Sequence, residues 1–437
     1  MALIVLAIAV AILLVLIGLK VDAFVALLIT AFITGILDHM GPDAALKSLL
    51  KGFGDTVGSL GLIILFGAML GRLIEESGAA HTIAGALTRL LGRNRVQLAV
   101  LITAFLVGLA MFFQPAFFIL IPLIYTLSAT TGQPLMQLAI PFCAALSVTH
   151  GYLPPHPGVT AVAVMLHADV NRTLLYGLFI AIPAMIVGGP LLAILFRGLR
   201  AQPPARLFRQ RTFAAEELPG IGVSLTAVLF PVAVMLAGAA VTMTASGDNG
   251  LTAAVRFLSE PNVVLFLSVV LAFCLLGLRR GRSLGALMKE ASEAIGGVAP
   301  VLFVIAGGGA FKQVLLDGGT GEAVRQLAGQ VHISPIVLAW STAALLRGAV
   351  GSATVSAITA AGIVLPIVPA SGVRPELVVL AIGAGSITFS HFSDSGFWIF
   401  KEYFDLTVRQ TLATWTLMEI VIGVAGLAGV LLLNLML

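Results

Sequence analysis

Long apolar stretches separated by short polar interruptions follow one another along nearly the whole chain. A helix that crosses a membrane needs about 20 mostly apolar residues, and most of these stretches approach or exceed that length. They are apolar on every side, which is typical of helices buried in lipid rather than of half-buried strands. We therefore expect an all-α polytopic membrane protein. The stretches cover residues 2–19, 23–37, 57–71, 97–127, 135–148, 174–196, 221–243, 263–278, 296–311, 336–368, 377–387 and 412–437.

The composition agrees with a chain surrounded by membrane lipid. Hydrophobic residues make up 59% and charged residues 10% of the 437 positions, against about 25% charged residues in a soluble domain. So many apolar residues cannot be sheltered in one aqueous core. Residues 2–19 lack a charged leader and a cleavage site, so we expect a retained span and not a removed signal peptide. A single-span receptor and a soluble enzyme are both excluded.

Charge and motifs exclude several other classes of protein. The net charge is +4, and no segment carries a dense basic face, so we expect no nucleic-acid partner. The chain has no Walker A lysine motif, no HExxH pair and no GxGxxG fingerprint. We therefore expect no cofactor, no metal site and no ATP-driven pump. A hydrolase triad would need an oriented acid that the sequence alone does not reveal.

The second half of the chain repeats features of the first half. Residues 197–219 are basic and contain Pro203-Pro204, and we interpret them as a linker between a first repeat, 1–196, and a second repeat, 220–437. Short polar and glycine matches recur at nearly constant spacing. Gly67, Arg72 and Gly78 match Gly307, Lys312 and Gly318 at an offset of 240, and Thr149-His150 match Ser390-His391 at 241.

The relative orientation of the repeats follows from the number of crossings between them. The glycine-rich stretch 57–71 could be a full span or a re-entrant hairpin, and we count it and the similar stretch 296–311 as re-entrant hairpins that do not cross. We expect 97–127, interrupted at Gln114-Pro115, and 336–368, interrupted at Arg347, to cross once each. Five membrane crossings then separate equivalent points of the two repeats. Because five is an odd number, the second repeat is inverted in the membrane relative to the first. Such inverted repeats with broken helices are typical of secondary transporters. The chain would make about 10 full crossings, with the basic linker 197–219 and a second basic patch, residues 279–282, on the cytoplasmic side.

Arg347 is the most unusual residue of the apolar stretches. A guanidinium at membrane depth needs an anionic partner, and its planar fork suits a carboxylate. A bound organic anion would supply that carboxylate. The alternative is a structural ion pair with Asp394, or a set of backbone carbonyls. Ser352 and Thr354 follow on the same stretch and offer hydroxyls, unless they bond back to their own helix.

Prolines and glycines interrupt the first repeat at residues 147–158. Irregular backbone at membrane depth is tolerated where it lines a cavity, so this segment is a candidate ligand site. Imidazole titrates near physiological pH, which makes a proton-handling role reasonable, although a histidine is often only a hydrogen-bonding residue. The candidate substrate-binding residues here are Ser147, Thr149, His150, Gly151 and His156, with His150 also a candidate for proton coupling.

A second interruption follows at residues 386–396. Ser390 and His391 are candidate substrate-binding residues, and Asp394 carries the only carboxylate of this loop. Asp394 is therefore the leading candidate for proton coupling, with a helix N-cap as the alternative. Gly308 and Gly309 are further binding candidates, because a glycine lets the backbone approach a ligand, or else they form a hairpin tip.

Four motifs together are specific enough to identify a family. The chain resembles the gluconate permease (GntP) family of bacterial inner-membrane symporters over nearly its whole length. The resemblance implies proton-coupled uptake of a sugar acid such as gluconate, alternating access by elevator-type motion, and often a homodimer. The motifs are SVTHGYLPPHPG (147–158), GGGAFKQV (307–314), LRGAVGSATVSAIT (346–359) and SHFSDSGFWIFKEYF (390–404).

Two departures from the family pattern affect the expected substrate and coupling. The pattern has Glu at the position of Gln114, and Asn-Asp-Pro at Ser393-Asp394-Ser395. We expect the substrate to be a small hydroxylated organic acid whose carboxylate group binds Arg347. Protonation of Asp394 or a loop histidine would favour the state of the transporter that holds the substrate. The alternatives are a permease for a small hydroxylated amino acid such as D-serine, and an anion channel.

Overall fold

The computed structural model describes residues 2–92, 95–199, 201, 215–244, 250–319, 334–391 and 394–437. In these ranges the chain forms helices and no strand, which confirms the all-α prediction. Residues 202–214 of the predicted linker lie outside the described residues. The first helices are α1 (Ala2–Gly18), α2 (Ala23–Leu37), α3 (Pro42–Glu76), α4 (Ala79–Leu91), α5 (Val96–Ala110), α6 (Phe113–Thr131), α7 (Leu135–Tyr152), α8 (Pro157–Met165) and α9 (Val170–Ile186).

The rest of the chain is equally helical. Three π-helical turns continue neighbouring helices: η2 (Val187–Leu191) after α9, η5 (Phe273–Gly277) after α12 and η8 (Leu412–Thr416) before α20. The helices are α10 (Ile221–Thr244), α11 (Gly250–Leu258), α12 (Pro261–Ala272), α13 (Leu284–Asp317), α15 (Pro335–Val350), α16 (Ala353–Val364), α17 (Pro375–Ile387), α18 (Ser395–Tyr403), α19 (Val408–Thr411) and α20 (Leu417–Met436).

Seven helical segments of the described chain are long and apolar enough to cross a membrane. Six further apolar helices are shorter. Large hydrophobic side chains such as Phe179, Leu345 and Leu432 are exposed on the outside, which suits lipid rather than water. The protein is a multi-pass membrane protein, and the count of 10 crossings stays a prediction. The long segments are Pro42–Glu76, Phe113–Thr131, Val170–Phe196, Ile221–Thr244, Pro261–Arg280, Leu284–Asp317 and Val408–Met436.

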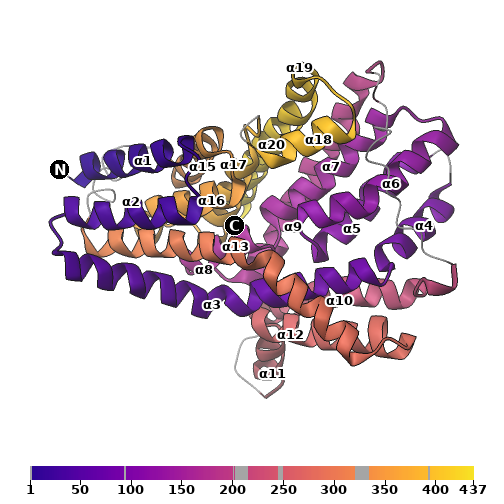
Figure 1. The fold of residues 1–437 in the computed structure, drawn as a ribbon, viewed down its shortest axis with the longest axis horizontal. Coiled ribbons are helices and arrows are strands. Elements are labelled where there is room, and N and C mark those ends of the chain that lie inside the picture. Colours follow the sequence, from indigo (N-terminus) through magenta and orange to yellow (C-terminus); the bar gives the residue numbers. More distant parts are fainter. Residues whose placement is uncertain are drawn as a thin grey trace.

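The two longest helices, α3 and α13, pack side by side and link the two sides of the molecule. Figure 1 shows α1 and α2 along the N-terminal part of α3, and α4, α5, α6 and α10 on the opposite side. Glycines allow the close approach of the pair. A Cβ added to Gly52 would lie 2.6 Å from the Cβ of Gln313, and one added to Gly309 would lie 2.9 Å from the Gly52 carbonyl oxygen.

The glycine-rich stretches differ from the expected hairpins, because each lies inside a continuous helix. Residues 57–71 belong to α3, and the chain turns only afterwards, at Ser77 and the left-handed Gly78. Residues 296–311 belong to α13. A glycine lowers helix stability by only about 1 kcal/mol, and a helix is the simplest way to satisfy backbone groups in lipid. The crossing count that implied inversion relied on those hairpin turns, so inversion stays a prediction.

The over-long stretches are broken, but not at the residues expected. The first breaks at Met111 and Phe112, between α5 and α6, so that Gln114 lies in the first turn of α6. The second breaks at Gly351 and Ser352, between α15 and α16. Proline is tolerated in a first turn because its missing N–H has no helical partner there, so Pro115 does not interrupt α6. Arg347 is in the last turn of α15, and Gly351, with φ of 80°, ends that helix.

The other two interruptions are shorter than the polar motifs that pointed to them. Helix α7 continues through residues 147–152, so Ser147, Thr149, His150 and Gly151 are helical, and the break covers residues 153–156. In the second case α17 ends at Ile387, and α18 begins after Asp394. Asp394 is the N-cap of α18, because its Oδ1 accepts the Gly396 amide at 3.0 Å.

The same order of elements occurs twice along the chain. The first set of elements is the long helix α3, the two broken pairs α5–α6 and α7–α8, and the helix α9 with its π turn η2. They recur as α13, α15–α16, α17–α18 and η8–α20. This recurrence is what repeats at 1–196 and 220–437 would produce, and those boundaries stay a prediction.

Candidate functional site

A cavity of about 830 Å³ lies where the broken helices meet. Its wall combines parts of α3 and α13 with the α5–α6 break, the end of α7, the α15–α16 break and the start of α18. Apolar and polar groups alternate on this wall, as in a site for a small polar ligand. Six residues predicted from the sequence line it: Ser147, His150, Arg347, Ser352, Thr354 and Asp394.

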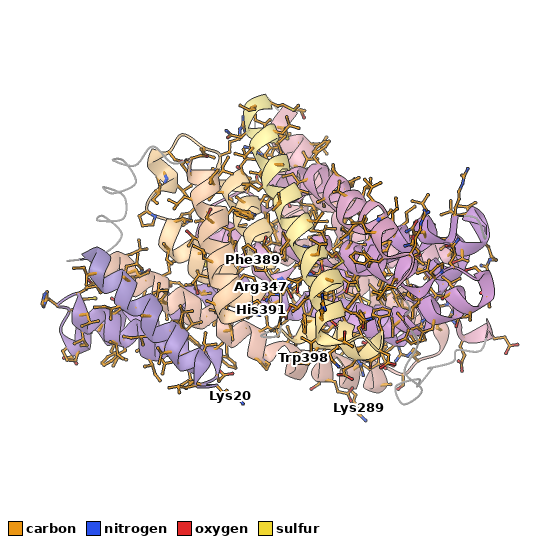
Figure 2. All side chains as sticks on the ribbon, turned by 90° about the horizontal axis from the view of Figure 1, so that it is seen from above. Lys20, Lys289, Arg347, Phe389, His391 and Trp398 are labelled. Atoms are coloured by element: carbon orange, nitrogen blue, oxygen red, sulfur yellow. The ribbon has the colours of Figure 1, made fainter. Side chains whose placement is uncertain are left out.

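Arg347 and Asp394 form a buried ion pair at the cavity wall. The Nη2 of Arg347 donates to Oδ2 of Asp394 at 2.5 Å, and its Nη1 donates to the Gly351 carbonyl oxygen. The Ser390 hydroxyl also donates to Asp394. The Nε of Arg347 has no acceptor among the described residues. Figure 2 shows Arg347 near the centre of the molecule. The guanidinium therefore has a carboxylate partner within the chain, while its Nε–H has no acceptor among the described residues.

Three helices present their amino-terminal ends to the same cavity. Phe113 and Gln114 begin α6, Thr354 lies in the first turn of α16, and Ser395 and Gly396 begin α18, and all five line the cavity. The backbone dipole gives a helix a partial positive charge at this end, so helix N-termini favour anions. The ends of three helices and the guanidinium of Arg347 together make this part of the cavity suited to a carboxylate.

Glu419 is a cavity residue that sequence reasoning missed. It lies in the first turn of α20 and is 3% exposed. Its Oε1 accepts the Ser147 hydroxyl at 2.5 Å, and its Oε2 has no hydrogen-bond partner among the described residues. A signal was present in the sequence, because Glu419 is the only charged residue of stretch 412–437. An ionisable group in such a stretch is a functional candidate by default.

The two predicted histidines of the first repeat differ in their access to the cavity. His150 lines it, and its Nδ1 has no partner among the described residues. His156 is buried behind it, with its Nε2 2.6 Å from the Gly108 carbonyl oxygen. The two rings meet edge to face at 5.6 Å between centroids. His150 can therefore contact a ligand, while His156 holds the α7–α8 break against α5.

Other predicted residues lie behind the cavity wall and make packing contacts. Thr149 bonds back to the Leu146 carbonyl oxygen at 2.9 Å. Gly151 packs on Ile387, where an added Cβ would come within 2.9 Å. Ser390 accepts the indole N–H of Trp415 at 2.7 Å in addition to its bond to Asp394.

His391, Gly308 and Gly309 also lie outside the cavity lining. The Nε2 of His391 lies 2.7 Å from the Gly348 carbonyl oxygen, next to Arg347 in the chain. Gly308 packs on Ile358, and Gly309 lies at the crossing of α3 and α13. These residues position the helices that carry the cavity residues.

Gln114 and Ser395, two of the positions at which we expect a departure from the family pattern, touch each other at the cavity. The Nε2 of Gln114 donates to the Ser395 hydroxyl oxygen at 3.1 Å. Phe113, beside Gln114, meets Trp415 edge to face at 5.6 Å. Gln114 and Ser395 thus form one polar contact between the start of α6 and the start of α18. Ser393 lies outside the described residues.

A group of charged residues lies on the part of the cavity wall formed by α3 and α13. Arg72 pairs with Glu76 at 2.9 Å on its own helix and with Glu293 on α13 at 3.3 Å. All these side chains are partly exposed, so each pair contributes little to stability. Among the described residues, no three His, Cys, Asp or Glu side chains gather as metal ligands.

Sequence comparison identifies the family of the chain. The family model "GntP family permease" matches residues 1–436. A relative from Escherichia coli K12, a Gnt-II system L-idonate transporter, is 47% identical over 99% of both chains. A high-affinity gluconate transporter of the same organism is 43% identical, again over 99% of both chains. A gluconate permease from Bacillus licheniformis is 43% identical over 98% of this chain and 97% of its own.

Solved structures share the fold at much lower identity. The YdaH transporter of Alcanivorax borkumensis matches with a TM-score of 0.64 and 16% identity, over 96% of this chain and 97% of its own. MtrF of Neisseria gonorrhoeae, of a class of antimetabolite efflux pumps, matches with a TM-score of 0.65 and 17% identity, over 90% and 84%. The family model and the curated relatives agree on a transporter and not an enzyme. The chain belongs to the GntP family of permeases.

Proposed function

We propose that this permease imports a sugar acid such as gluconate across the bacterial inner membrane by proton symport with alternating access. The relatives are named as transporters of gluconate and L-idonate, and both compounds are sugar acids. The observation that carries the proposal is the buried guanidinium of Arg347 at a cavity that three helix N-termini also face. A sugar, which lacks a carboxylate, would not use this cluster of positive charge.

The substrate carboxylate binds Arg347 in place of Asp394. The ion pair already holds a carboxylate against this guanidinium, and the Nε of Arg347 has no acceptor among the described residues. An arginine fork can bind a carboxylate through two N–H groups, which favours a planar anion over a point charge. Binding and release of substrate therefore alternate with closing of the Arg347–Asp394 pair.

The hydroxyls of the substrate bind polar groups elsewhere on the wall. Ser147, Ser352, Thr354 and Gln114 offer donors and acceptors around the cavity. Thr149 and Ser390 were also expected to bind hydroxyls, but they lie behind the wall in the conformation described and would need a rearrangement. A volume of about 830 Å³ leaves room for a six-carbon acid with some water.

The proton gradient drives uptake if proton and substrate bind more tightly together than separately. Asp394 and His150 are the carriers predicted from the sequence. The Asp394 carboxylate is engaged by Arg347, Ser390 and the Gly396 amide, so it becomes free for a proton only when the ion pair opens. Homodimer assembly, which the resemblance implies, stays a prediction.

A small amino acid such as D-serine is the second candidate substrate. Its ammonium would need an acidic partner close to the site of its carboxylate, and Glu419 and Asp394 both line the cavity. A neutral hydroxyl places no such demand. The two substrate classes therefore differ in the group that lies opposite the carboxylate.

Exchange of substrate in proteoliposomes tests the proposed substrate class. Vesicles loaded with unlabelled gluconate should take up labelled gluconate, and external L-idonate should compete. Glucose tests the requirement for a carboxylate and should not compete. Competition by D-serine but not by L-idonate would contradict a sugar-acid substrate.

A further inference from the structure

Glu419 is a buried carboxyl at the cavity for which no role has been assigned above. We propose that Glu419, rather than Asp394, binds the coupled proton. This assignment rests on the proposed function and deepens it. The proton binds Oε2 while the cavity is open to the outside, and it leaves to water when the cavity opens to the inside.

The hydrogen bonds of Glu419 leave one oxygen atom free. Oε1 accepts the Ser147 hydroxyl at 2.5 Å. Oε2 is buried and has no partner among the described residues. A protonated carboxyl has one O–H donor, and Oε2 is the atom on which that hydrogen displaces no existing bond.

The charges around Glu419 favour a proton rather than a permanent counter-ion. Asp394 has the guanidinium of Arg347 as its partner, whereas Glu419 forms no ion pair with any described residue. An ionised carboxylate that is buried without a counter-ion is costly, and proton binding removes its charge. Asp394, at the start of α18, and Glu419, on α20, both line the cavity. Only Glu419 can therefore accept a proton without first breaking an ion pair.

The ionisable groups around Glu419 are few. Arg347 and Asp394 act on it electrostatically, and on α7 so do Cys143 and Tyr152. His150 lies one turn of α7 beyond Ser147 and also lines the cavity.

The charged residues of α9 and α17 lie at the starts of those helices, whereas it is the later residues of both helices that pack against α20, the helix of Glu419. Arg172 is at the start of α9, whose later residue Ile180 packs on Gly429. Glu376 begins α17, whose end packs on Gly423 through Thr388. The nearest fixed charges are thus one cation and one anion that already neutralise each other.

Binding of the sugar acid connects the two acidic groups. When the substrate carboxylate takes Arg347, Asp394 loses its cation and remains near Glu419 as a negative charge. A proton on Glu419 reduces the repulsion among these groups, so substrate and proton stabilise each other in the cavity. The cavity changes from facing the outside to facing the inside only after both the substrate and the proton have bound, in either order.

The Glu419→Gln variant separates proton coupling from substrate binding. Glutamine keeps an acceptor for Ser147 but cannot exchange a proton. We expect the variant to exchange labelled gluconate across vesicles at equilibrium and to lose accumulation driven by an inward proton gradient. Exchange by the variant should also lose its dependence on pH. Asp394→Asn should keep one proton per gluconate, whatever its substrate affinity.

Glu376→Gln is the matched control. Glu376 is a second buried glutamate, and it accepts the Asp169 amide away from the cavity. This variant should accumulate gluconate as the wild type does. If Glu419→Gln accumulates gluconate to the same level, or if Asp394→Asn alone abolishes coupling, the assignment is wrong.

A second variant keeps the test valid if Glu419→Gln does not fold. Glu419→Asp keeps the carboxyl but shortens its reach to Ser147, so the pH profile of uptake should shift while coupling is retained. An unchanged profile would overturn the assignment. Failure of the proposed function looks different, because wild-type protein would then neither exchange nor accumulate gluconate.

Discussion

Arg347 on α15 and Asp394 at the start of α18 form an ion pair at the cavity, with Nη2 and Oδ2 2.5 Å apart. The sequence left open whether Arg347 binds an organic anion or a carboxylate of the protein. The structure shows the second arrangement in this conformation. Because the pair faces the cavity, the same guanidinium can serve both partners in turn, and the first two predictions follow from that exchange.

Arg347→Lys should weaken gluconate binding about 10- to 100-fold. A hydrogen bond to a charged group contributes about 1.5–3 kcal/mol, and each 1.4 kcal/mol is about tenfold in affinity. Lysine keeps the charge but not the planar fork. The measurement is the dissociation constant for gluconate in purified protein. Arg374→Lys, at an exposed arginine, serves as the control. Equal affinity in wild type and Arg347→Lys would exclude the fork as the carboxylate site.

Asp394→Asn should bind gluconate more tightly than the wild type while being less stable without ligand. The variant removes the competitor for Arg347 but leaves a buried cation unpaired, which costs about 3–5 kcal/mol. Added gluconate should therefore raise the thermal unfolding temperature more in the variant than in the wild type. If gluconate binding is lost as in Arg347→Lys, Asp394 helps to bind the substrate instead of competing with it.

Gln114→Glu should make gluconate binding more sensitive to pH than in the wild type. Gln114 donates to the Ser395 hydroxyl oxygen, whereas an ionised glutamate could only accept from that hydroxyl. An unperturbed glutamate loses its proton at about pH 4.3. Above that pH the new negative charge repels the substrate carboxylate, so affinity falls as pH rises. The ratio of dissociation constants at low and neutral pH measures the effect. Identical pH profiles for variant and wild type would place the substrate far from Gln114.

Gly309→Ala should destabilise the protein by about 1–3 kcal/mol through overpacking. The added Cβ would lie against Thr56 and the Gly52 carbonyl oxygen at the crossing of α3 and α13. Gly296→Ala, on the same helix with open space around it, is the control and should be neutral or stabilising. Thermal unfolding in detergent compares them. Equal unfolding temperatures would show that the crossing tolerates a methyl group.

Apolar patterning predicted the helical class, but it misplaced several of the helix ends. Prolines marked the break within 147–158, because proline changes the local backbone directly. A run of polar residues marked the break within 386–396. Glycine alone was misleading in 57–71 and 296–311. Its effect there depends on which helix packs against it, as Gly52 and Gly309 show, and this is a property of tertiary structure.

The cavity could be predicted only in part for the same reason. Arg347 and Asp394 stood out because they are charged and lie in or beside apolar stretches. The pairing of Ser147 with Glu419 joins residues 272 positions apart and leaves no local pattern. The packing of η8 and α20 against the loop decides whether the Ser390 hydroxyl faces the cavity or Trp415. The presence of a hydroxyl at position 390 could therefore not predict a contact with substrate.

Gluconate uptake by the purified protein in proteoliposomes tests the central claim most directly. An inward proton gradient is imposed, and the same uptake is then measured after an ionophore has collapsed the gradient. Sugar-acid proton symport predicts accumulation above equilibrium that disappears with the gradient. Gluconate that equilibrates at the same rate with and without the gradient, in vesicles shown to hold folded protein, would contradict proton coupling.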